Sequence, residues 1–174
     1  ARIACAVDQS LAKQGVNIII GHMVSSVATD TVKNANENKV LLISPTIAME
    51  ELTYIDDNFI RVIASNKVQG YSLAKAVLRE TPVRSIAIVY DENNASLAKI
   101  INESFEMQMR DSGGSVVANA SFKNRSDFKS IISVLRESNA DGVLLIASAI
   151  DAGMFCQQSR KQNLKLPVFS PMWT

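Results

Sequence analysis

The sequence predicts an α/β fold in which strand-helix-strand units build mostly parallel sheets with helices on both faces. Short apolar runs rich in β-branched residues recur along the chain, and each is followed by apolar side chains at helical spacing. Such alternation is typical of right-handed crossovers between parallel strands. The run 86–90 (Ile-Ala-Ile-Val-Tyr) is apolar at every position, as expected of a central strand buried on both faces.

The predicted elements alternate along the whole chain. Gly15 is expected to end the first helix, Gly113 and Gly114 the fourth, and Ser126 is expected to cap the fifth, ahead of Asp127 in its first turn. Strands are predicted at 16–21, 40–44, 59–64, 85–91, 115–122, 142–148 and 167–170. Helices are predicted at 2–14, 26–37, 66–80, 95–111, 127–138 and 151–162.

The middle of the chain predicts a change of lobe. Residues 50–58 are polar and rich in turn formers, and a strand and a new helix follow them. We therefore expect part of a first lobe at 1–62 and most of a second lobe at 63–174. The first lobe is too thin to be complete.

Composition narrows the class of protein. The 174 residues are 47% hydrophobic, and 18 basic against 17 acidic residues leave a net charge of +1 without a basic block, so no nucleic-acid partner is expected. No apolar run approaches the roughly 20 residues that span a bilayer, and residues 1–15 have a helical pattern unlike a signal peptide. Because the chain lacks an initiating Met, we expect a processed or truncated form with any export signal upstream. Cys5 and Cys156 are expected to be buried free thiols.

Two buried strands run into small hydroxyl residues, which predicts a small-molecule site. Ser25 and Ser26 follow the strand 16–21, and Thr46 follows the strand 40–44. Ligands of open α/β sheets collect outside the carboxyl ends of the strands. If Ser25 or Ser26 caps the next helix, its free N–H groups and positive end would face an anion, so a carboxylate could bind without Lys or Arg. The alternative is that these serines only cap the helix.

Six segments follow one another in an order and spacing known from one protein family. They are Ile-Ile-Gly-His-Met-Val-Ser-Ser (19–26), Leu-Ile-Ser-Pro-Thr (42–46), Glu-Leu-Thr (51–53), Phe-Ile-Arg (59–61), Gln69-Gly70 and Ile-Ala-Ile-Val-Tyr-Asp (86–91). From about residue 2 to Thr174 the chain resembles the type I periplasmic binding proteins, especially the leucine/isoleucine/valine receptors that feed ABC importers. The resemblance implies two α/β lobes that close over a ligand, and a complete receptor about twice this length, of which this chain is a central part.

The resemblance also implies ligand contacts in the first lobe. The loop with Met23, Ser25 and Ser26 resembles the segment that meets the ligand carboxylate, with Ser25 at the hydroxyl position. The loop after Pro45 resembles its partner, which puts Thr46, Ile47 and Ala48 at the cleft.

In the second lobe the chain departs from the amino-acid receptors. Where they offer an acidic residue for the ligand ammonium, this chain has Met172 and then Trp173. Their aromatic ligand contact falls on Ser148 or Ala149, and their Tyr-Gly pair is replaced by Asn-Asn-Ala-Ser (93–96). A branched-chain amino acid is therefore less favoured, and a small carboxylate, an aromatic acid or an amide stays open.

Four further residues have a binding and a structural interpretation. Trp173 could stack on a planar ligand or pack at a strand end. Asp151 could accept an ammonium, although its place at a helix start favours an N-cap. Tyr90 and Asp91 end the central strand and could line the crevice, and Asp91 could equally cap the next turn.

The remaining polar residues give no sign of catalysis. The chain has no Gly-x-Gly-x-x-Gly turn, P-loop or Gly-x-Ser-x-Gly elbow. The one histidine, His22, is expected to make a structural hydrogen bond, and Ser44 is expected to pair with backbone. The sequence thus favours an extracytoplasmic receptor, without metal or cofactor, that binds a small amino acid or related carboxylate for a membrane permease, with or without a lipid anchor. A ligand-sensing domain of the same fold is the alternative.

Overall fold

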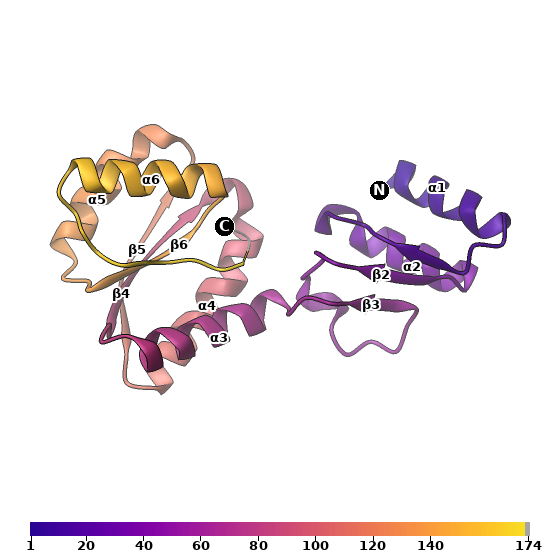
Figure 1. Ribbon diagram of the computed structural model, residues 1–174, viewed down its shortest axis with the longest axis horizontal. Helices are drawn as coiled ribbons and strands as arrows, with labels where there is room; N and C mark the ends of the chain where they lie inside the picture. The colour runs from indigo at the N-terminus through magenta and orange to yellow at the C-terminus, as the bar shows by residue number, and fades with distance from the viewer. Residues whose placement is uncertain (173–174) are drawn as a thin grey trace. The chain divides into compact units, whose positions relative to one another are not determined.

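The computed structural model describes residues 1–172 (Figure 1). The chain divides into two compact units, unit 1 at Ala1–Asn66 and unit 2 from Lys67 onward. The sequence predicted a boundary after residue 62, within the segment that joins the last strand of unit 1 to the next helix. The assignment of the units to the two lobes of a receptor stays a prediction.

Unit 1 is a three-stranded parallel sheet with its helices on one face. The strands lie in the order β1-β2-β3, and in register Ile20 is opposite Ile43. Val32 and Ala35 of α2 pack on Leu42 of β2, and α1 lies beside α2. The elements are α1 (Arg2–Lys13), β1 (Ile18–Ile20), η1 (Ser25–Val27), α2 (Ala28–Asn38), β2 (Leu41–Ser44), η2 (Glu50–Leu52) and β3 (Phe59–Arg61).

The other face of the unit 1 sheet is apolar and exposed. Ile20 and Val62 are 80% and 72% exposed, and Ile18 and Ile60 are exposed as well. Helices on both faces, as predicted, are therefore not found in the described part of unit 1.

Unit 2 is a four-stranded parallel sheet in the order β5-β4-β6-β7. Its central strands are buried on both faces, which confirms the prediction for this unit. Ile86, Ile88, Leu144 and Ile146 form a core cluster with residues of α3 and α4, and Ala87, Val89, Val143 and Leu145 form another with residues of α5 and α6. Figure 1 shows these two helix pairs on opposite sides of the sheet. The elements are α3 (Asn66–Glu80), β4 (Ser85–Asp91), η3 (Glu92–Asn94), α4 (Ala95–Asp111), β5 (Ser115–Phe122), η4 (Arg125–Asp127), α5 (Phe128–Glu137), β6 (Gly142–Ile146), α6 (Ala149–Lys161) and β7 (Val168–Phe169).

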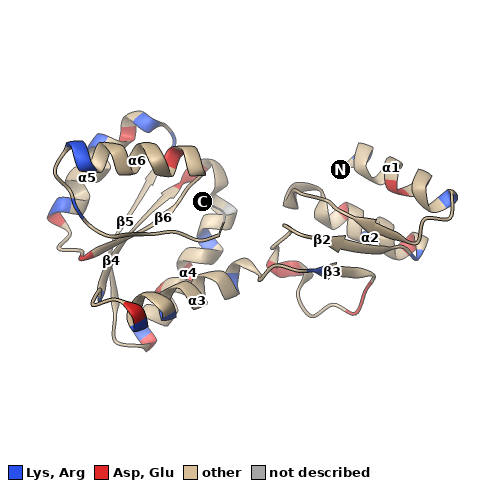
Figure 2. Cartoon of the chain, in the orientation of Figure 1, with Lys and Arg blue, Asp and Glu red and all other residues tan. Residues whose placement is uncertain are grey.

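Most charged residues lie on the helices and loops of both units, with acidic and basic residues interspersed (Figure 2). In unit 1, Arg61 ends the strand β3. In the strands of unit 2, Asp91 at the end of β4 is the one charged residue. None of the helices within residues 1–172 is both long and apolar enough to cross a bilayer. Cys5 and Cys156 are free thiols as predicted, but they are partly exposed rather than buried.

Local caps explain where the predicted boundaries shift. Gly15 and Gly113 have positive φ angles of 85° and 82° just beyond α1 and α4, which confirms their role as helix ends. The prediction for Ser126 is wrong. The carboxylate of Asp127 instead accepts the N–H groups of Lys123 and Asn124 at 3.1 and 3.0 Å, so the turn η4 begins before Ser126.

Candidate functional site

In unit 1, two loops leave the carboxyl ends of β1 and β2 and are tied together by side-chain hydroxyls. The buried Ser44 Oγ donates to the His22 carbonyl at 2.9 Å and accepts the N–H groups of Ile47 at 3.0 Å and Thr46 at 3.3 Å. Thr46 Oγ1 donates to the Met23 carbonyl at 2.9 Å. Ser44 therefore pairs with backbone, as the sequence predicted, and fixes the spacing of both loops.

The two serines of the first loop have free hydroxyls. Ser25 and Ser26 are exposed, and neither side chain makes a hydrogen bond within the part of the chain that the structure describes. The prediction that one of them caps the helix is wrong: Val24 precedes η1 and Val27 precedes α2, and neither position has a side-chain cap. The helix is entered through a 3-10 turn that begins at Ser25, so the serines lie inside the first turn.

Of the other unit 1 residues predicted to contact a ligand, two lie at the surface and two in the core. Met23 and Thr46 are exposed beside the serines, whereas Ile47 and Ala48 are buried. A ligand role for these residues stays a prediction, and for the two buried side chains it would have to involve the backbone.

His22 is held by a residue that the sequence did not single out. Its Nε2 atom lies 2.9 Å from Oδ2 of Asp8, a buried carboxylate on α1. This confirms the structural hydrogen bond expected of His22. The only available signal for Asp8 was an acidic residue on the inward face of an amphipathic helix.

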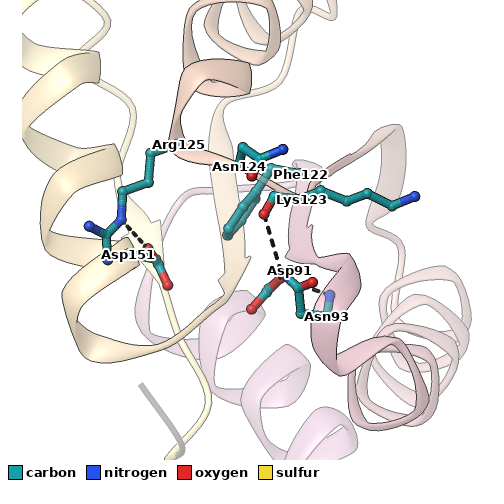
Figure 3. A pocket seen from close by; sticks show the side chains of 7 residues that line it. All are labelled: Asp91, Asn93, Phe122, Lys123, Asn124, Arg125 and Asp151. Carbon is teal, nitrogen blue, oxygen red and sulfur yellow. Dashed lines mark hydrogen bonds and ion pairs between the residues drawn. The ribbon is translucent and has the colours of Figure 1, made fainter.

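In unit 2, a cavity of about 310 Å³ lies at the carboxyl ends of β4 and β5 and the start of α6 (Figure 3). Six of the seven residues that line it are polar or charged, and the seventh is Phe122. Phe122 makes an edge-to-face contact with Phe128 (ring centroids 5.0 Å apart), which makes another with Phe155 (5.5 Å), so the aromatic core continues below the cavity. The lining residues are Asp91, Asn93, Phe122, Lys123, Asn124, Arg125 and Asp151.

Asp151 forms hydrogen bonds with Ser148 at the start of α6 and an ion pair with Arg125. Ser148, and not Asp151, is the N-cap: its Oγ accepts the Asp151 N–H at 3.2 Å and donates to Asp151 Oδ2 at 2.6 Å. Arg125 Nε donates to Asp151 Oδ1 at 2.7 Å. The hydrogen bond from Ser148, followed by the one from Arg125, lowers the pKa of Asp151. The N-cap expected at Asp151 is therefore Ser148, three residues earlier, because β6 ends at Ile146 and α6 begins at Ala149.

Asp91 caps η3 and lines the cavity, and Tyr90 packs on the core; a ligand contact of either residue stays a prediction. Asp91 Oδ1 accepts the N–H and the Nδ2 of Asn93 at 2.9 and 2.8 Å, so it caps η3 while it also lines the cavity. Tyr90 packs against the core on the α3 and α4 face and is not among the lining residues. Trp173 lies outside the described residues.

Sequence reasoning missed most of the cavity. The sequence marks Asn93 only as a departure from the receptors that it resembles, and it does not single out Lys123, Asn124 or Arg125. Their one signal was position: they follow strands whose carboxyl ends meet at one edge of the sheet. A larger cavity of about 410 Å³ is lined by residues of α6, β6 and the segment around β7, and its lining includes Cys156 and Ser159.

Comparisons with known proteins agree on one family. Residues 1–173 match a family model described as periplasmic binding protein. The chain is 25% identical over 171 residues to the Leu/Ile/Val-binding protein of Citrobacter freundii. This alignment covers 97% of the chain and 46% of the Citrobacter protein. The chain thus spans about half the length of the curated relatives it matches.

Solved structures show the same fold. The branched-chain amino acid transporter substrate binding protein LivJ from Streptococcus pneumoniae, in complex with isoleucine, has a TM-score of 0.77 and 24% identity over 96% of this chain and 47% of that chain. A solute binding protein of an ABC transporter from R. palustris, in complex with benzoate, has a TM-score of 0.77 and 20% identity over 98% of this chain and 48% of that chain. At these identities the likeness establishes the fold.

Proposed function

The chain belongs to the periplasmic binding protein family, as the resemblance in its sequence indicated, and from that premise we propose that it is part of the substrate-binding receptor of an ABC importer for small carboxylates. We also propose an extracytoplasmic location and a membrane permease as partner. Both follow from the kind of protein to which the chain is similar.

The free hydroxyls at the carboxyl edge of the unit 1 sheet are the observation that carries the proposal. Ser25 and Ser26 lie in the first turn ahead of α2, where backbone N–H groups lack helical partners and the helix dipole favours negative charge. Thr46 holds the second loop beside the first through its bond to the Met23 carbonyl. The loops 22–26 and 45–48 contain no Lys or Arg, so these neutral donors would bind the anion.

The ligands named for similar proteins are consistent with such a site. The Citrobacter protein is named for leucine, isoleucine and valine, and the two solved structures hold isoleucine and benzoate. All of these molecules carry a carboxylate and differ at the other end. A small amino acid or a related carboxylate is therefore the ligand class that we propose.

We propose binding without catalysis. His22, the one histidine, is engaged with the Asp8 carboxylate instead of a hydroxyl or thiol nucleophile. General acid-base chemistry would need such a residue within reach of a reacting group.

Calorimetric titration tests the carboxylate site. The ligands are isoleucine, benzoate and isoleucinol, in which an alcohol replaces the carboxylate. Isoleucine or benzoate should bind and isoleucinol should not, and Ser25→Ala should weaken binding by about 1–3 kcal/mol because a hydrogen bond to a charged group is lost. Ser10→Ala, at an exposed serine of α1, is the matched control. Equal affinity of the Ser25 variant would remove this residue from the site, and equal binding of isoleucinol would refute carboxylate recognition.

A further inference from the structure

The larger cavity of unit 2, the α6 cavity, combines apolar walls with a few polar groups. Its volume is about 410 Å³, within the range of roughly 300–1,000 Å³ found for small-molecule sites. Apart from two serines, a cysteine and an arginine, the lining consists of aliphatic residues, glycine and proline, among them Leu145, Leu166 and Val168. Such walls suit the carbon chain of a small molecule, and the polar groups decide what else it must carry.

Ser159 contributes a buried hydroxyl without a partner. The residue is 6% exposed, and its Oγ forms no hydrogen bond within residues 1–172. A serine inside a helix commonly donates to the carbonyl one turn earlier, as Ser104 does to Ile100 at 2.9 Å, but Ser159 makes no such bond. The other serine of the lining, Ser170, donates to the Leu145 carbonyl at 3.0 Å. Because an unpaired buried donor is unfavourable, a ligand with an acceptor oxygen would be stabilised here.

Cys156 and Arg160 lie on the same side of α6 as this hydroxyl. Cys156 is three residues before Ser159 and four before Arg160, and residues at these spacings are neighbours on a helix, with Cβ atoms roughly 5–6 Å apart. Cys156 is a free, partly exposed thiol. Arg160 is exposed, is the one charged residue of the described lining, and has no side-chain partner within residues 1–172. The cavity thus brings together a thiol, an unpaired donor and an uncompensated positive charge.

We propose that Cys156 is a reversible modification site for low-molecular-weight thiols that carry a carboxylate. In the modified protein Cys156 Sγ forms a mixed disulfide, the carboxylate pairs with the Arg160 guanidinium, and a carboxylate oxygen accepts from Ser159 Oγ. The inference concerns a cavity within unit 2 and does not depend on the proposed function.

The chemistry is thiol–disulfide exchange with a small disulfide as the oxidant. The Cys156 thiol loses its proton to solvent, and the thiolate sulfur attacks one sulfur of the small disulfide. The new S–S bond forms as the old one breaks, and the other half of the reagent leaves as a thiolate that takes up a proton. Cys156 is oxidised and the leaving sulfur is reduced, so no further reactant is needed. An excess of the free thiol reverses the step.

Three matched disulfides test the assignment on the full chain. They are 3,3′-dithiodipropionate, bis(2-hydroxyethyl) disulfide and cystamine, whose arms have the same length and end in a carboxylate, an alcohol and an ammonium. Peptide mass spectrometry measures the rate of modification at Cys156, and the same chain unfolded in urea gives the intrinsic reactivity of each reagent. Relative to this reference, the folded protein should favour the carboxylate reagent over the ammonium reagent by about tenfold or more. This comparison needs no variant, so a folding defect cannot obscure it.

Two substitutions then identify the groups. Arg160→Gln should reduce the preference to within about twofold of the reference, whereas Lys161→Gln, which removes a charge from the next residue of α6 outside the cavity lining, should leave it unchanged. Ser159→Ala should lower the equilibrium constant for the mixed disulfide with 3-mercaptopropionate by about tenfold, because a hydrogen bond to a charged group is lost. It should not lower the thermal stability of the unmodified protein, since the hydroxyl has no partner there.

Three results would overturn the proposal. The first is that none of the reagents modifies Cys156 in the folded protein, or that all react at the same relative rate. The second is an unchanged preference in Arg160→Gln. The third is an unchanged equilibrium constant in Ser159→Ala, because the unpaired hydroxyl is what distinguishes this site from a thiol that merely lies beside a charge.

Discussion

Replacing Ser44 with alanine should destabilise unit 1 by about 2–3 kcal/mol. The Ser44 hydroxyl is the point at which the loops after β1 and β2 meet, because it donates to the His22 carbonyl and accepts two backbone N–H groups. Alanine retains the size of the backbone and Cβ but removes all three bonds.

The three bonds contribute unequally. Ile47 is fully buried, so its N–H would be left without a partner and without water, at a cost of about 1–3 kcal/mol. Loss of the bond to the His22 carbonyl costs about 0.5–1.5 kcal/mol. The bond from the Thr46 N–H is long, at 3.3 Å, and Thr46 is exposed, so water can replace it. The two losses add up to about 1.5–4.5 kcal/mol. The expected 2–3 kcal/mol lies within this range and corresponds to an increase of about 30- to 140-fold in the equilibrium constant for opening, at 1.4 kcal/mol per factor of ten.

Amide hydrogen exchange measures this opening locally, which matters because two compact units need not unfold together. The Ile47 amide should exchange faster in Ser44→Ala by about the factor given above, while amides of β4 in unit 2 keep their rates. Ser10→Ala is the control, since Ser10 is exposed on α1 and only accepts a long bond from a nearby glutamine. A change of less than about 0.5 kcal/mol in the opening free energy of Ile47 would show that Ser44 does not hold the loops.

Two further predictions concern unit 2. Ser148 and Arg125 lower the pKa of Asp151 below its ordinary value of 3.8, so the ionised carboxylate stabilises the fold above that value, and this contribution is lost as pH falls through the lowered pKa. In an acid titration followed by circular dichroism, Asp151→Asn should therefore lose less stability below about pH 4 than the wild-type protein. An identical loss in both proteins would contradict this role of Asp151. In chemical denaturation, Gly70→Ala should destabilise the protein by about 1–3 kcal/mol or more, because a Cβ would lie 2.5 Å from a backbone oxygen of α4 and closer still to Ser104 Oγ. Gly153→Ala, at a helical position with open space around it, should instead stabilise the protein by up to about 1 kcal/mol. Equal effects of the two substitutions would refute the packing argument.

The periodicity of apolar residues, together with glycine and polar turn residues, predicted the helices and strands well wherever both signals were present. The strand 115–122 and the helices 66–80 and 95–111 have the bounds that the sequence indicated, since apolar runs there end at glycine or polar turns. The strand expected at 142–148 stops at Ile146, because Ser148 is used as a cap, and β3 stops at Arg61 for lack of a longer partner in β2.

The side-chain partnerships could not be predicted in the same way. Arg125 and Asp151 are 26 residues apart, and Asp8 and His22 are 14 apart, on elements whose distance and orientation depend on the packed core. The free hydroxyls of Ser25 and Ser26 depend on whether the helix opens with a 3-10 turn, which is decided by local backbone geometry. The sequence therefore indicated the edge of each sheet at which polar groups gather, but not the pairing that decides which of these groups remain available.

Phe122 belongs both to the cavity lining and to the aromatic series with Phe128 and Phe155, and this double membership couples the size of the cavity to thermal stability. Truncating Phe122 would deepen the cavity but remove an edge-to-face contact and buried area from the core, at about 3–5 kcal/mol for Phe→Ala. A directed-evolution screen for a larger cavity at this position should therefore recover compensating changes on α5 and α6.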